Sequence, residues 1–87
     1  MNPTASGKIL DFLSRDKDDG VRFEVAGNEN TLSKTLVYLS CDKHPVIRRN
    51  VAISKNTPPE TLALLGQELY DFGIQYFTAK NPNTPRK

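Results

Sequence analysis

The residues that could carry out catalysis are few. The 87-residue chain has one histidine and one cysteine, His44 and Cys41, which stand three positions apart. A thiol activated by an imidazole is a nucleophile–base pair, and such a pair needs a third group to orient the base. The sequence offers no clear third group, and Pro45 directly after His44 indicates a turn. We favour a packed thiol and a loop histidine, and we expect no catalytic residue and no enzymatic activity.

The acidic run at residues 16–20 (DKDDG) raises the question of a calcium site. An EF-hand loop has acidic residues at alternating positions, glycine at the sixth position and glutamate at the twelfth. Here glycine is the fifth residue of the run, and Gly27 occupies the twelfth position. A turn with helix-capping carboxylates explains the run better. One cysteine is too few for a disulfide, a zinc site or an iron–sulfur cluster, so we expect no metal and no cofactor.

Charge is distributed unevenly along the chain. Residues 34–59 hold five basic and one acidic side chain, a net charge of +4. Residues 8–33 hold four basic and six acidic side chains, a net charge of −2. The formal net charge of the whole chain is +2, which does not by itself indicate a nucleic-acid partner.

Four basic side chains are candidates for contact with a partner: Arg22, Arg48, Arg49 and Lys55. Arg22 and Arg48 are 26 positions apart, and a repeating fold would place them in a row. Such a row could bind the phosphates of a nucleic acid or an acidic peptide. The alternative is that the arginines pair with acidic side chains of neighbouring units, at Asp16, Asp42 or Glu68.

Aromatic residues are concentrated near the end of the chain. Four of the seven fall between positions 70 and 77: Tyr70, Phe72, Tyr76 and Phe77. We expect some of them to pack on the last leucines and others to remain exposed. Because exposed aromatic side chains favour interfaces, Tyr70, Phe72 and Tyr76 are candidates for binding a protein partner or a second copy of this chain.

The elements that position these residues follow from a repeat of 26 residues. Leucines recur at positions 10, 36 and 62 and again at 13, 39 and 65. An Asn-Thr pair closes each unit, the third after one inserted residue. This periodicity indicates one domain built from stacked units, with boundaries at about 8–33, 34–59 and 60–87.

Each unit is predicted to form two short helical segments. At the boundary of the second unit, Thr57 is expected to cap the next segment, with Pro58 at its first helical position and Glu60 completing a capping box. In the second unit Pro45 opens the second segment, which is about two turns long and is either α or 3₁₀ helix. Ile47 and its neighbours Val51 and Ala52 should face inward. Two such segments cannot bury their apolar faces alone, so neighbouring units must cover each other.

These residues also resemble a known family, the leucine-rich repeat variant (LRV). The stretches LSRDKDDGVRFEVAGNENT, LSCDKHPVIRRNVAISKNTPPETLALL and IQYFTAKNPNTP are similar to its pattern L-x-x-L-x-x-D-x-x-x-x-V-R-x-x-V-A-x-N-P-x-T-P. The resemblance spans roughly residues 9–85 and implies an all-α fold: a short right-handed superhelical solenoid of alternating α and 3₁₀ helices. The third unit departs from the pattern, with Gln75 in place of the arginine. The cysteine-rich iron–sulfur segment of some LRV proteins is not carried over.

The function that we expect is that of a non-enzymatic protein–protein interaction module. The alternative is nucleic-acid binding through the basic row, and a homodimer through the C-terminal end is a further hypothesis. Apolar runs such as LALL are far shorter than the roughly 20 residues that a membrane span needs. The N-terminal residues show no apolar region typical of a secretory signal. We therefore expect no membrane partner and a cytoplasmic location.

Overall fold

The computed structural model describes residues 6–68 and 71–85. These residues form six α-helices and no strand, which confirms the all-α fold class. Helices of seven and nine residues alternate in the order α1 (Gly7–Leu13), α2 (Asp19–Gly27), α3 (Ser33–Leu39), α4 (Pro45–Ile53), α5 (Pro59–Leu65) and α6 (Phe72–Lys80). None of these helices has the length and hydropathy that crossing a membrane requires.

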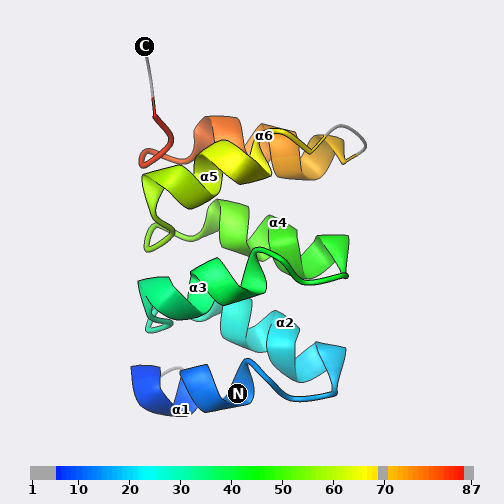
Figure 1. Ribbon diagram of the computed structural model, residues 1–87, viewed down its shortest axis with the longest axis vertical. Coiled ribbons are helices and arrows are strands. Elements are labelled where there is room, and N and C mark those ends of the chain that lie inside the picture. The colour runs from blue at the N-terminus through cyan, green and yellow to red at the C-terminus, as the bar shows by residue number, and fades with distance from the viewer. Residues whose placement is uncertain (1–5, 69–70, 86–87) are drawn as a thin grey trace.

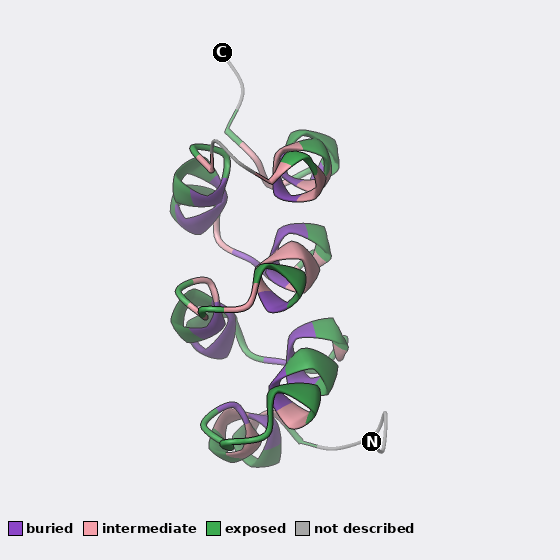
Figure 2. Ribbon diagram, turned by 90° about the vertical axis from the view of Figure 1, so that its right-hand side faces the viewer, coloured by how far each residue is buried: buried purple, intermediate pink, exposed green. Residues whose placement is uncertain are grey.

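The helices lie in two layers (Figure 2). The shorter helices α1, α3 and α5 form one layer, and the longer helices α2, α4 and α6 form the other. Within the longer layer α4 packs against both α2 and α6, whereas each shorter helix packs mainly against the longer ones. The molecule measures 36 × 22 × 16 Å, and α1 and α6 lie at opposite ends of its long axis (Figure 1).

The core lies between the two layers and takes residues from every helix. Five of the six repeating leucines are buried as predicted: Leu10, Leu36, Leu39, Leu62 and Leu65. The sixth, Leu13, is only partly buried because α1 is the first described helix and nothing described packs beyond it. The longer helices bury their predicted inward residues, among them Ile47, Val51 and Ala52.

The predicted cap of α5 is wrong. The helix begins at Pro59 after Pro58, and no side chain caps it. Thr57 is instead fully buried, and its hydroxyl donates to the carbonyl oxygen of Val51 at 2.6 Å. The last carbonyls of a helix lack partners within that helix, so Thr57 completes the end of α4. Glu60, in the first turn of α5, therefore has no capping box to complete.

The longer helices begin much as the sequence indicates. Pro45 is the first residue of α4, and the carboxylates of Asp18 and Asp71 cap α2 and α6 by accepting from backbone N–H groups. All three longer helices are α-helices of nine residues. The 3₁₀ segments implied by the LRV resemblance are therefore absent from the described part of the chain. Nine residues are enough for two full turns of α-helical hydrogen bonds.

Candidate partner-binding surfaces

Arg22 is a structural residue in this fold. Only 8% of it is exposed, and its Nε donates to Asp42 Oδ2 at 2.7 Å. Its Nη1 donates to the carbonyl oxygens of Asp16 and Lys17, at 2.9 and 3.0 Å. One guanidinium therefore ties the turn after α1 to the turn after α3. Because these contacts use its donors inside the molecule, Arg22 is not available to a phosphate at the surface.

The charges of this pair are stabilised by each other. Hydrogen bonding to Asp42 raises the pKa of Arg22 above its ordinary value, against the opposing effect of burial. Burial raises the pKa of Asp42, but the hydrogen bonds from Arg22 and from the His44 N–H outweigh it, and the pKa of Asp42 falls below its usual range. The pair therefore stays ionised at neutral pH.

Arg48 holds the corresponding place one helix pair later. Its Nη1 donates to the carbonyl oxygen of Asp42 at 2.6 Å, and its Nη2 lies 3.6 Å from Glu68 Oε2. In the third helix pair Gln75 donates to the carbonyl oxygen of Glu68. The side chain at the position of Arg22, Arg48 and Gln75 therefore donates to a carbonyl oxygen of the preceding turn in each helix pair. The two arginines also contact a carboxylate of the following turn.

Arg49 and Lys55 are more accessible than Arg22. Arg49 makes a two-point contact with Asp71, with Nε–Oδ1 and Nη2–Oδ2 distances of 3.2 Å each. This hydrogen bonding lowers the pKa of Asp71. Gly73 leaves room for the contact, because a Cβ there would lie 2.7 Å from Arg49 Nε. Lys55 is exposed, and no described carboxylate lies within ion-pair distance of it.

The aromatic residues of α6 are divided between the core and the surface. Phe72 is 79% exposed and Tyr76 is 56% exposed, whereas Phe77 packs against the core. The rings of Tyr76 and Phe77 meet edge to face at 5.2 Å, and Lys80 Nζ lies 5.6 Å from the centre of the Tyr76 ring. Tyr70 lies outside the described residues. The structure thus leaves two of the three predicted aromatic contacts open to solvent.

Exposed apolar residues on the shorter helices were missed at the sequence level. Phe12 on α1 is 77% exposed, and Tyr38 on α3 and Leu64 on α5 are also exposed. These three residues follow one another at steps of 26. The step that located the buried leucines could therefore have located this outward position too. Its aromatic content, Phe12 and Tyr38, was the available signal.

Cys41 and His44 do not form a reactive pair. The expectation of a packed thiol is wrong, because Cys41 is exposed, with its Sγ 3.9 Å from Ser40 Oγ. His44 Nε2 lies 3.2 Å from Asp19 Oδ2, across the gap between α4 and α2. In the acidic run, Asp16 and Asp18 each accept a hydrogen bond from a nearby backbone N–H. No group of three or more histidine, cysteine or carboxylate side chains that could hold a metal ion occurs among the described residues.

Comparison with known proteins adds no assignment. No protein-family model matches the chain, and searches of curated proteins and of solved structures also find no match. The resemblance to LRV repeats therefore rests on the sequence motifs alone, and the candidate surfaces rest on the geometry described above.

Proposed function

We propose that this chain is a non-enzymatic protein-binding module and that α6 carries a contact surface. The observation that supports this most strongly is the exposure of Phe72 and Tyr76 on one short helix. Aromatic side chains supply much of the binding energy of protein interfaces. Lys80 beside Tyr76 adds a cation to the same surface.

Nucleic-acid binding through the basic row has less support. Arg22 is buried against Asp42, Arg48 contacts Glu68 and a backbone carbonyl, and Arg49 contacts Asp71. A nucleic acid binds to protein cations that replace the counterions condensed on its phosphates, in an exchange that releases those counterions. A cation already paired within the protein contributes less to that exchange. Of the four predicted basic contacts, Lys55 alone is exposed without a described ionic partner.

We also propose that the two layers form a short right-handed superhelical solenoid with units at about 8–33, 34–59 and 60–87, as the LRV resemblance implies. Contacts that recur from unit to unit support this. Asn56 Nδ2 donates to the carbonyl oxygen of Glu29 at 2.9 Å, and Asn83 Nδ2 donates to that of Lys55 at 2.6 Å. Stability would then come from interfaces between adjacent units. A binding surface could spread over several of them.

Site-specific photo-crosslinking in the native host tests the function. Benzoylphenylalanine in place of Phe72 should form an adduct with a discrete protein when irradiated, because position 72 is almost fully exposed on α6. The matched control places the same residue at Phe12, which is 77% exposed on the helix at the other end of the molecule.

The pattern of adducts decides the outcome. A protein adduct at position 72 that is weak or absent at position 12 supports the proposed surface. An adduct of twice the mass of the chain would identify the partner as a second copy. Equal adducts at both positions, or none at position 72, would contradict the proposal that α6 carries the surface.

A further inference from the structure

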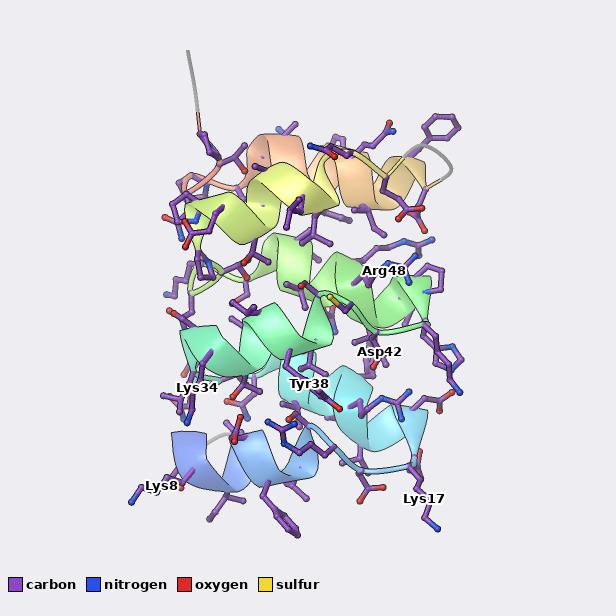
Figure 3. All side chains as sticks on the ribbon, in the orientation of Figure 1. Lys8, Lys17, Lys34, Tyr38, Asp42 and Arg48 are labelled. Atoms are coloured by element: carbon purple, nitrogen blue, oxygen red, sulfur yellow. The ribbon has the colours of Figure 1, made fainter. Side chains whose placement is uncertain are left out.

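An open hollow of about 760 Å³ lies between the first and second helix pairs, beside α1 and α3. It arises where the two shorter helices pack mainly on the longer layer. The hollow is lined by Arg15, Lys17, Val37, Tyr38, Cys41 and Lys43. The ion pair between Arg22 and Asp42 also lines it. Figure 3 shows Tyr38 and Asp42 on this face, with Lys17 at its lower edge.

The hollow combines an apolar surface with cations. Val37 and Tyr38 of α3 are each about half exposed there, at 45% and 46%. The guanidinium of Arg15 lies 4.3 Å from the centre of the Tyr38 ring. This cation–π contact holds a positive charge directly over the apolar surface.

The two lysines stand on turns that arginines hold in place. Arg22 donates to the carbonyl oxygen of Lys17 itself. Arg48 donates to the carbonyl oxygen of Asp42, the residue before Lys43. Because the backbone at both positions is fixed before a ligand arrives, less ordering is needed on binding.

The two lysines of the hollow have no ion-pair partner in the described part of the protein. Neither Lys17 nor Lys43 has a described carboxylate within ion-pair distance, and Arg15 has only Asp11 at 3.9 Å, one turn away. Of the two carboxylates that line the hollow, Asp42 is paired with Arg22, whereas Asp16 has no described ion-pair partner and adds a negative charge. The four cations and two carboxylates that line the hollow give it a formal net charge of +2 beside its apolar surface.

We propose that this hollow binds an acidic segment of a partner protein, with an apolar or aromatic side chain against Tyr38 and carboxylates against Lys17 and Lys43. The proposal rests on the protein-binding function above but uses a surface separate from Phe72 and Tyr76. A nucleic acid fits less well. Its affinity grows with the number of phosphates contacted, whereas this hollow has only three accessible cations within one short stretch of surface.

A defined probe tests the proposal. A fluorescein-labelled peptide of sequence EDDFEDE should bind the purified chain saturably, in the micromolar range, by fluorescence anisotropy. The same peptide with serine at every acidic position should not bind, and added salt should weaken binding. The acidic peptide should also slow alkylation of Cys41 by iodoacetamide, because the only cysteine of the chain lines the hollow.

Two variants of equal charge locate the site. Lys17→Glu with Lys43→Glu should raise the Kd for the peptide at least about tenfold. Lys8→Glu with Lys34→Glu changes the net charge equally on exposed positions of α1 and α3 outside the hollow, and should change the Kd less than about threefold. Circular dichroism must show that both variants keep the helical content of the parent.

Several results would overturn the proposal. They are the absence of saturable peptide binding, equal losses in the two charge-reversed variants, and tighter binding of a twelve-residue oligothymidylate than of the peptide. Failure here is distinguishable from failure of the α6 surface, because Phe72→Ser with Tyr76→Ser should leave peptide binding unchanged. Adducts at position 72 can likewise form whether or not the hollow binds the peptide.

Discussion

At the scale of single residues, Arg22 and Arg48 each join a preceding turn to a carboxylate further along the chain. The sequence offered both interpretations for Arg22 and Arg48, and the structure pairs them with Asp42 and Glu68. The 26-residue step could identify these candidate pairs. It could not show that Arg22 is buried, because that depends on the turn carbonyls that its guanidinium reaches. The role of Arg22 becomes visible only in the folded structure, where its guanidinium contacts both the turn after α1 and the turn after α3.

Removing one partner of this pair should be costly. We expect Asp42→Ala to lower the free energy of unfolding by about 3–5 kcal/mol, because it leaves a buried guanidinium without a counter-charge. Urea denaturation followed by circular dichroism measures the loss. Asp16→Ala is the matched control, because Asp16 occupies the equivalent position 26 residues earlier and is exposed. This substitution should change the free energy of unfolding by less than about 0.5 kcal/mol. Equal effects of the two substitutions would show that the Arg22–Asp42 contact contributes little.

Stability should also fall in acid. The folded protein lowers the pKa of Asp42 and of Asp71 below the ordinary value of 3.8. A group with a depressed folded pKa stabilises the fold above its unfolded pKa and loses that contribution as pH falls through the folded value. The melting temperature should therefore be constant around pH 6 and should decline as the pH drops toward and below 3.8.

The variant Asp71→Asn isolates one of these two contributions. It should melt at a lower temperature than the parent at pH 6, and its melting temperature should depend less on pH below that point. Thermal melts across the range make the comparison. A parent protein whose melting temperature is unchanged down to pH 3 would contradict the assigned contacts of Asp42 and Asp71.

At the scale of the elements, the sequence predicted the helices better than their ends. Leucine spacing located the buried faces of α1, α3 and α5 because burial follows helical period. Pro45 located the start of α4 because proline is tolerated at a first helical position. Thr57 was misassigned as a cap. A threonine hydroxyl can accept from a backbone N–H of the helix that follows it, or donate to a carbonyl oxygen of the helix that precedes it, as Thr57 does. The choice depends on the path of the loop, which local spacing does not specify.

The buried face can be tested with one substitution at two positions. Leu39→Ala, on the central helix α3, should cost roughly 2–5 kcal/mol because it removes a fully buried side chain and leaves a cavity. Leu64→Ala on α5 is the control, and should cost less than about 0.5 kcal/mol because Leu64 is 70% exposed. Denaturant unfolding of both variants against the parent gives the two values. Leu39→Ala melting like the parent would contradict the placement of Leu39 in the core.

At the scale of the whole molecule, two layers of helices bury the apolar faces and leave aromatic residues at both ends. The concentration of aromatic residues between positions 70 and 77 predicted exposure on α6, and Phe72 and Tyr76 are exposed there. Exposure of Phe12 on α1 was not predicted, although the 26-residue step places Phe12 and Tyr38 at one outward position of the repeat. The hollow beside Tyr38 was not predicted either. It depends on how far apart α1 and α3 lie, which no sequence pattern expresses.

We propose that this chain binds protein through α6 while its arginines hold the helix pairs together. A quantitative pull-down from native host lysate, divided into nuclease-treated and untreated halves, tests it most directly. The tagged parent should recover the same discrete protein from both halves, and Phe72→Ser with Tyr76→Ser should lose it. Recovery that disappears with nuclease, or that the double variant retains in full, would contradict protein binding through α6.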